Sequence, residues 1–376
     1  MTKNCTGSII IRKIDLILIA VQNNVSREKM IDFDIRKRFG AHSGNSAGLD
    51  VGSHAIKMLE ISGTQEKPSL ASFGIKEIQG SSAEIISESV KTLAQELKIT
   101  VKTLNVALTG PSVLARVISM PNMTDEELKN AVRFETEKFI PFDINECTLD
   151  FHVQGKDSRE KNNVDILLAA AKKDFVLQKI KVVEAAGFSV NVVDVDSFAA
   201  TNAFLKNFTS IEPDKTVALL NIGATHTNLI ILKNGVIAFV RDLTIGVGDF
   251  RTMVSKKCGV DIDALDGLKG VSADKTLEIR ICAKAALASL VDEIKLSFGY
   301  HENQSGSGID QICISGGGAG FIGLEEALNE AFGAKPERWN PFQFLDINPS
   351  GIDVDEIARS SSSFAVAIGL ALRGAS

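Results

Sequence analysis

Residues 47–61 read AGLDVGSHAIKMLEI, an apolar run, a tight D-V-G-S turn and a second apolar run. This pattern predicts two strands joined by a short turn. Because Gly52 lacks a Cβ atom, the turn's backbone can approach a bulky anion closely. Asp50 could hold a divalent metal or its water, while Ser53 offers a hydroxyl and Lys57 a cation. The D-x-G-S string is short, however, so an ordinary β-hairpin explains it equally well.

A similar plan returns about 170 residues later, in VALLNIGATHTNLIIL at residues 217–232. An apolar strand runs into N-I-G-A-T, a second β-rich run follows, and the K-N-G string at 233–235 predicts a hairpin into a further strand. The repeated plan predicts two similar lobes whose glycine turns face each other across a cleft. We place the boundary between them at residues 213 and 214, a Pro-Asp step.

The third segment is QICISGGGAGFIGLEEALNEAFG at residues 311–333, a strand that ends in a glycine-rich loop and opens into an amphipathic helix. Such a loop lets a flat or anionic ligand approach the backbone at a helix N-terminus. The spacing is not the G-x-G-x-x-G of a dinucleotide fold, and no G-K-[ST] follows as in a P-loop. A tight strand-to-helix turn without a ligand explains the loop equally well.

Composition narrows the function classes. The 376 residues are enough for two domains with real cores. A net charge of −6, with one Trp and one Tyr, gives no attraction to nucleic acid and no stacking platform for bases. The five cysteines form no C-x-x-C pair, which argues for a reducing compartment and against a zinc site or a disulfide framework.

The N-terminal residues do not fit the remainder of the chain. Residues 8–21 read SIIIRKIDLILIAV, and the uninterrupted apolar run at 16–21 is far shorter than the ~20 residues that a membrane span needs. Asp15 and the lack of a small-x-small cleavage site argue against a signal peptide. We therefore expect residues 1–46 to be a disordered or mis-annotated extension, with Met30 as an alternative start, and no direct membrane span.

Between the first two glycine turns, hydrophobic periodicity and helix signals predict a series of alternating elements. Thr124 and Glu127 have the spacing of a capping box, and the helix that they open should end at the Ile140–Pro141 step. The predicted helices are 82–97, the one ending at 140, 174–186 and 197–208, and the predicted strands are 104–108, 149–153, 164–171 and 190–195.

Taken in order, GLDVGSHAIK, LLNIGATHT and ISGGGAG resemble the phosphate-1, phosphate-2 and adenosine motifs of the actin-like ATPase superfamily. Within its FtsA/PilM branch, the chain resembles the PilM family of type IV pilus assembly. RVISMPNMTDEELKNAVRFETEKFIPFDINECTLD is similar to that family's inserted subdomain. VNVVDVDSFAATNAF and SSSFAVAIGLALR are similar to its two connecting helices. The resemblance covers about residues 48–373.

The resemblance implies an α/β, actin-like, two-lobed fold with duplicated sheet-and-helix lobes and a nucleotide cleft between them. The first lobe is expected at 47–213, with a small α+β subdomain inserted at about 103–187. The second is expected at 214–354, with a helical subdomain at about 246–309. Residues 355–376 should form a connecting helix that returns to the first lobe.

The resemblance also implies site residues and cofactors, ATP or ADP with Mg²⁺. Asp50 would hold the metal or its water shell, Gly52 and Ser53 would wrap the β-phosphate, and Lys57 would face the β- and γ-phosphates. The other expected nucleotide-binding residues are Gly223, Thr225 and Thr227 in the opposing loop, Gly316, Gly317 and Gly318 against the adenosine, and Asp266 and Lys269 on the ribose-facing helix. Asp266 and Lys269 could equally be a surface i,i+3 pair.

Two departures from the superfamily pattern bear on mechanism. Active members usually carry Asp where this chain has Asn221, and some carry a polar residue in place of Ala224. An amide can neither act as a base nor add negative charge beside Mg²⁺. Asp196 occupies the place of the water-orienting residue, although it could equally cap the helix. We therefore expect ATP binding with slow or no hydrolysis, the nucleotide acting as a clamp between the lobes.

The family's role implies a cytoplasmic scaffold that captures the N-terminal tail of the inner-membrane protein PilN and is recruited to the membrane through its partners. Other inner-membrane assembly components and self-association are further expected interactions. Phe134, Phe139 and Phe142 are candidates for a peptide groove beside the inserted subdomain, with plain core packing as the alternative.

Three rival functions remain at this stage. An FtsA-like division filament protein would be expected to carry an amphipathic membrane helix after a linker, which is not seen after Arg373. A sugar or acetate kinase would need a catalytic Asp, for which only Asp196 is a candidate. The cytoplasmic part of a type II secretion protein would continue into a membrane span.

Overall fold

The computed structural model describes residues 44–64, 67–156, 162–208, 212, 214–265, 268, 271–347 and 351–374. The predicted extension at 1–46 lies outside the described residues except for its last three positions. Asp266 and Lys269 also lie outside them, so their predicted ribose-facing role stays a prediction.

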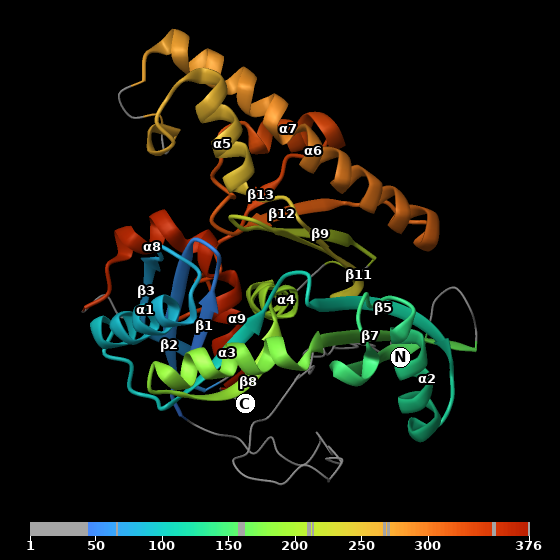
Figure 1. Ribbon diagram of the computed structural model, residues 1–376. Coiled ribbons are helices and arrows are strands. Elements are labelled where there is room, and N and C mark those ends of the chain that lie inside the picture. The colour runs from blue at the N-terminus through green and yellow to red at the C-terminus, as the bar shows by residue number, and fades with distance from the viewer. Residues whose placement is uncertain are drawn as a thin grey trace, which may run out of the picture.

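Two five-stranded sheets of matching plan form the two lobes (Figure 1). In each, three strands form an antiparallel meander, and two further strands continue the sheet in parallel from the meander's first strand. The first sheet has the order β3-β2-β1-β4-β8, formed by β1 (Ser46–Val51), β2 (Ala55–Gly63), β3 (Pro68–Glu77), β4 (Thr103–Leu108) and β8 (Ser189–Val195). The second has the order β11-β10-β9-β12-β13, formed by β9 (Thr216–Ile222), β10 (Thr227–Lys233), β11 (Val236–Leu243), β12 (Gln311–Ser315) and β13 (Glu337–Arg338). The predicted duplication is confirmed.

Helices cover both faces of the first sheet. One pair, α1 (Ala83–Glu96) and α3 (Lys173–Ala185), packs together, and α4 (Asp196–Asn207) packs against α9 (Ala365–Gly374) on β1, β4 and β8. In the second lobe, the main helices are α5 (Val247–Cys258), α6 (Ala273–Ser305) and α7 (Leu324–Phe332). The described residues also form the short helices α8 (Val354–Ser360), η2 (Ile144–Glu146), η3 (Asp263–Leu265) and η4 (Ser361–Phe364), which lie in different parts of the chain.

Strand β9 shows how the lobes share a core. Successive side chains of a strand point to opposite faces. Val217 and Leu219 belong to the large core that also holds α4, α9 and the first sheet, whereas Ala218 and Leu220 belong to the core under α5 and α6. Helix α4 therefore lies between the two sheets and joins them (Figure 1).

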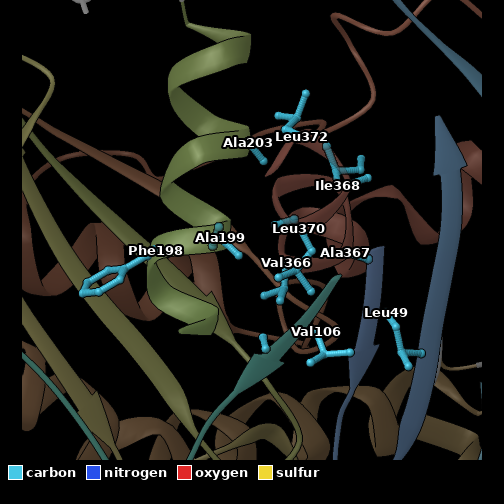
Figure 2. Close-up of a cluster of buried hydrophobic side chains, with 14 of the residues drawn as sticks. Leu49, Val106, Phe198, Ala199, Ala203, Val366, Ala367, Ile368, Leu370 and Leu372 are labelled. Atoms are coloured by element: carbon cyan, nitrogen blue, oxygen red, sulfur yellow. The ribbon is translucent and has the colours of Figure 1, made fainter. Parts of the chain in front are cut away.

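The α4–α9 crossing is unusually close (Figure 2). Figure 2 shows Ala199 and Ala203 of α4 facing α9, while Leu49 and Val106 approach α9 from the first sheet. A Cβ atom at Gly369 would lie only 1.7 Å from the carbonyl oxygen of Ala199. The two connecting helices touch backbone to backbone because one position carries no side chain.

The inserted subdomain is smaller than predicted. It consists of β5 (Val113–Pro121), β6 (Cys147–Lys156), β7 (Asn163–Lys172) and α2 (Asp125–Glu137), with sheet order β5-β7-β6. The predicted limits of 103–187 are wrong, because β4 is a central strand of the first sheet and α3 packs on that sheet. The capping box of Thr124 and Glu127 is confirmed, but α2 ends at Glu137, three residues before the predicted end.

The longest helix described, α6, does not have the composition of a membrane span. Helix α6 has 33 residues, but acidic and basic side chains recur along it. Among the described residues, no helix is both long enough and apolar enough to cross a bilayer.

Candidate functional site

The glycine turns of the two lobes meet. The hydroxyl groups of Ser53 and Thr225 lie 3.0 Å apart, one from the β1–β2 turn and one from the β9–β10 turn. Each turn is closed by its glycine, whose N–H donates back across the turn at 3.1 Å for Gly52 and 2.8 Å for Gly223. The turns thus have the same construction, and the predicted convergence is observed.

The glycine-rich loop after β12 packs beside the second turn. Gly318 donates its N–H to the carbonyl of Ile222 at 2.8 Å, and a Cβ atom at Gly316 would lie 2.3 Å from the same oxygen. Gly316 also has a φ of +91°, which favours glycine. Gly317 differs: it is exposed, and a Cβ atom there would meet only the Ser363 hydroxyl at 3.6 Å. Of the three predicted glycines, Gly317 alone is exposed.

An ion pair stands beside the first turn. Asp50 and Lys57 are cross-strand partners, and the Lys57 ammonium lies 3.1 Å from a carboxylate oxygen of Asp50. The same ammonium would lie 3.1 Å from a Cβ atom at Gly52, so it stands over the turn. A cation here fits a phosphate group, because ammonium groups bind phosphate as point charges.

No group of three or more acidic, histidine or cysteine side chains is arranged to hold a metal ion in the part of the chain that the structure describes. Mg²⁺ in nucleotide sites is commonly bound by one or two carboxylates together with water and phosphate oxygens. Asp50 stands in β1 directly before the first glycine turn, and it could supply the one carboxylate that such a site needs. The donor set is thus compatible with Mg²⁺ brought in by a nucleotide.

Thr227 does not have the predicted position. Its side chain is fully buried and its hydroxyl donates to the carbonyl of Ile245 at 2.8 Å. Thr227 therefore braces the turn against the segment before α5, and its expected contact with phosphate is wrong. The error follows from position: Thr225 lies exposed in the turn, whereas Thr227 is already the first residue of β10, whose side chains are buried.

A chain of buried polar groups crosses from one lobe to the other. Ser315 donates to Asn221 at 3.3 Å, and Asn221 donates to the side-chain oxygen of Asn228 at 2.9 Å. The amide nitrogen of Asn228 in turn lies 3.1 Å from a carboxylate oxygen of Asp196 and 2.7 Å from one of Asp242. Since Asp196 begins α4 and the other four residues belong to the second lobe, this network joins the lobes.

Asp196 is the first residue of α4 rather than its N-cap, which is Val195. One of its carboxylate oxygens accepts the N–H of Ser197 at 2.8 Å. Burial, together with the charge of the nearby Asp242 carboxylate, raises the pKa of Asp196 to about 8, and burial raises the pKa of Asp242 as well. At neutral pH this pair holds a proton, which makes Asp196 a weak acceptor for a proton from water.

Sequence reasoning did not single out Asn228 and Asp242. Asn228 is near the start of β10 and Asp242 is near the end of β11. Polar residues are common at both ends of ordinary strands, so neither position drew attention. The available signal was the continuous apolar run: Asn228 directly precedes Leu229, Ile230 and Ile231, and it is buried with them in β10.

A cavity of about 770 Å³ lies between the inserted subdomain and the second lobe, and their strands β5 and β11 also contact each other. Its walls are β5, β11 and the C-terminal part of α6, and both strands are outer strands of their sheets. Phe139 lines it, with the guanidinium of Arg116 4.2 Å from the ring centroid. Leu296, on α6, also lines it and is 64% exposed.

The three predicted groove phenylalanines do not share one surface. Phe134 is 65% exposed on α2, outside the cavity, whereas Phe142 packs against Ile144 and the Lys172 ammonium lies 5.0 Å from its ring. Of the three, only Phe139 lines this cavity. The three rings therefore do not line one cavity, and the alternative of core packing holds for Phe139 and Phe142, which pack against small apolar clusters.

Comparison with known proteins gives a family and a fold. The family model for "Type IV pilus assembly protein PilM" matches residues 48–375. A solved "PilM-PilN type IV pilus biogenesis complex" contains a chain 27% identical, with a TM-score of 0.78, covering 90% of this chain and 100% of that one. The ethanolamine utilization protein EutJ from Carboxydothermus hydrogenoformans is 13% identical, with a TM-score of 0.50, covering 87% of this chain and 89% of that one. The actin-like fold expected from the sequence is confirmed.

Proposed function

This chain belongs to the PilM family of type IV pilus assembly proteins, and we propose that it is an ATP-binding cytoplasmic scaffold that captures the N-terminal tail of PilN. The observation that carries this proposal is the match to the PilM chain of a PilM–PilN complex along that chain's whole length. Because the chain belongs to this family, we prefer the scaffold function to the FtsA-like, kinase and type II secretion alternatives. Recruitment to the inner face of the membrane would occur through partners.

The meeting of the two turns supports a nucleotide between the lobes. The Lys57 ammonium and the hydroxyl groups of Ser53 and Thr225 provide donors for phosphate oxygens. The exposed backbone at Gly317 would lie against the adenosine, and Asp50 would hold Mg²⁺ through its water. A ligand bound to both turns stabilises the closed arrangement of the lobes, which makes it a clamp.

Hydrolysis should be slow or absent. Water-orienting groups contribute orders of magnitude to phosphoryl transfer. Here Asn221 is an amide bonded to Asn228, and the raised pKa of Asp196 leaves that carboxyl mostly protonated at neutral pH. Neither group is suited to take a proton from an attacking water.

A pull-down with a synthetic peptide of the PilN N-terminal tail, with and without Mg·ATP, tests the scaffold role. We expect retention of the peptide, with a different amount in the presence of nucleotide because the lobes enclose the cavity beside the inserted subdomain. If the peptide is retained in neither condition, the proposed scaffold role is wrong.

The cavity between β5 and β11 is our proposed place for the tail. Outer strands present unpaired backbone groups along one edge, to which an extended peptide can add as a further strand. Apolar side chains of the peptide would pack on Phe139, Leu296 and Tyr300.

We expect Leu296→Asp to weaken binding of the tail by about tenfold or more, because an apolar anchor of this size contributes about 1.5–3 kcal/mol. Fluorescence polarisation of a labelled tail peptide measures the change. Leu277→Asp is the matched control, since Leu277 is 62% exposed on the same helix and does not line the cavity. Equal affinity of both variants and the wild type would place the tail elsewhere.

A further inference from the structure

A chain of three polar side chains leads from the first glycine turn into the second lobe. The hydroxyl groups of Ser53 and Thr225 lie 3.0 Å apart, and the Thr225 hydroxyl lies 2.8 Å from Nδ1 of His226. Thr225 is exposed in its turn, whereas His226 is half-buried. The middle member of this chain is therefore a residue to which a phosphate oxygen is proposed to bind.

His226 also lines the cavity in which the PilN tail is proposed to lie. It directly precedes β10, and Thr227, the first residue of that strand, is opposite Leu243 at the end of β11. His226 therefore lies at the end of the cavity nearest the glycine turns, where Asp242 and Thr244 also line it. One residue thus contacts the nucleotide turn and borders the peptide cavity.

The two nitrogen atoms of the His226 ring have different surroundings. Nδ1 faces the Thr225 hydroxyl, while Nε2 has no hydrogen-bond partner among the residues that the structure describes. In a neutral imidazole, one ring nitrogen carries the hydrogen and the other accepts a hydrogen bond, so fixing the role of one nitrogen fixes that of the other. The role of Nε2 toward a ligand in the cavity therefore depends on the hydrogen bond that Thr225 makes.

We propose that His226 couples the two sites, because a Thr225 hydroxyl that donates to phosphate leaves Nε2 as an acceptor for a backbone N–H of the tail. This inference rests on the proposed function. A threonine hydroxyl has one hydrogen to donate. When Thr225 donates it to a phosphate oxygen, its own oxygen can only accept from His226. Nδ1 then carries the ring hydrogen, and Nε2 is free to accept.

The same reasoning gives the direction of the coupling. In the absence of nucleotide, the Thr225 hydroxyl can donate to Nδ1, which places the ring hydrogen on Nε2 and prevents that atom from accepting. An extended peptide presents backbone N–H groups that need acceptors. Nucleotide should therefore strengthen binding of the tail.

The test measures the affinity of a labelled PilN tail peptide by fluorescence polarisation, with and without saturating Mg·ATP. One hydrogen bond between neutral groups changes an affinity by about 3- to 10-fold, so Mg·ATP should strengthen tail binding to the wild type by at least about threefold. In His226→Phe, which keeps a ring without nitrogens, this factor should fall to about one third of its wild-type value or less. Because coupling is reciprocal, the tail should strengthen nucleotide binding to the wild type by the same factor.

His54→Phe is the matched control. His54 follows the hydroxyl residue of the first turn, as His226 follows that of the second, but its side chain is 69% exposed and it does not line the cavity. This exchange should leave the factor at its wild-type value. His226→Asn keeps an amide near the position of Nδ1 but does not extend to that of Nε2, so it should lower the factor as phenylalanine does.

A second readout observes the ring in the wild-type protein and needs no peptide. Nitrogen NMR of the protein with labelled histidine distinguishes the two neutral tautomers, and the signals missing from His226→Asn identify His226. In weakly alkaline buffer the tautomer rather than the charge of the ring is observed. Addition of Mg·ATP alone should shift His226 toward the tautomer with its hydrogen on Nδ1.

The outcomes distinguish this inference from the function on which it depends. A wild-type protein that binds no nucleotide, or that binds the tail in neither condition, would overturn both. If both ligands bind, three results would overturn the role of His226 alone: no effect of Mg·ATP on tail binding to the wild type, an equal factor in the wild type and the two His226 variants, or an unchanged tautomer. A variant that binds the tail more weakly but keeps the wild-type factor gives the second of these results, because that pattern reports a structural histidine.

Discussion

Gly317→Val should weaken nucleotide binding by about 100-fold, about 2.7 kcal/mol, and leave the nucleotide-free protein folded. The chain itself has room for the new side chain, because the nearest atom to a Cβ at Gly317 is the Ser363 hydroxyl at 3.6 Å. A bound adenosine would occupy the same space. A thermal shift titration with Mg·ATP measures the effect, which should appear as a loss of ligand stabilisation.

Gly308→Val is the matched control for this variant. Gly308 is also exposed, its Cβ would lie 3.9 Å from the nearest atom, and it stands outside the three turns. Asp50→Ala should remove the Mg²⁺-dependent part of the shift, because it deletes the carboxylate proposed to hold the metal's water. An undiminished shift in Gly317→Val and Asp50→Ala would place the nucleotide at another site.

Gly369→Ala is expected to destabilise the protein by about 4 kcal/mol or more, or to prevent folding. The added methyl group would stand 1.7 Å from the carbonyl oxygen of Ala199, so α4 and α9 would have to separate. Both helices belong to the core shared by the two lobes, where close packing leaves little room to adjust. Soluble yield and urea denaturation measure the loss.

The same exchange at Gly299 should have the opposite sign. Gly299 lies within α6, and a Cβ atom there would meet nothing within 4 Å. Alanine restricts the unfolded chain more than glycine does, which should stabilise the protein by about 0.5–1 kcal/mol. A Gly369→Ala variant as stable as Gly299→Ala would show that the α4–α9 crossing can relax.

Local signals predicted the parts of the site that depend on backbone shape. Gly52 and Gly223 close tight turns, and Gly316 has a left-handed backbone. Thr124 caps α2. In each case the residue type by itself indicates the backbone conformation at its position. The repeated strand–turn–strand plan then predicted that the turns would meet. The side chains of Ser53 and Thr225 do so.

Positions that depend on which face of an element is covered were predicted less well. Thr227 and Phe134 match the expected residue types, yet one is buried under the turn and the other points to solvent. Strand β4 and helix α3 read as parts of the insertion, because sequence order does not show that they pack on the first sheet.

The sequence by itself determined the family, the duplicated lobes and the three glycine turns, because those features are written in short-range patterns of residue type. Only the tertiary structure decided that Asp196, Asn228 and Asp242 form one cross-lobe network. These groups come from separate elements. Their charges and hydrogen bonds depend on distances in space and on the water that packing excludes, neither of which a linear pattern specifies.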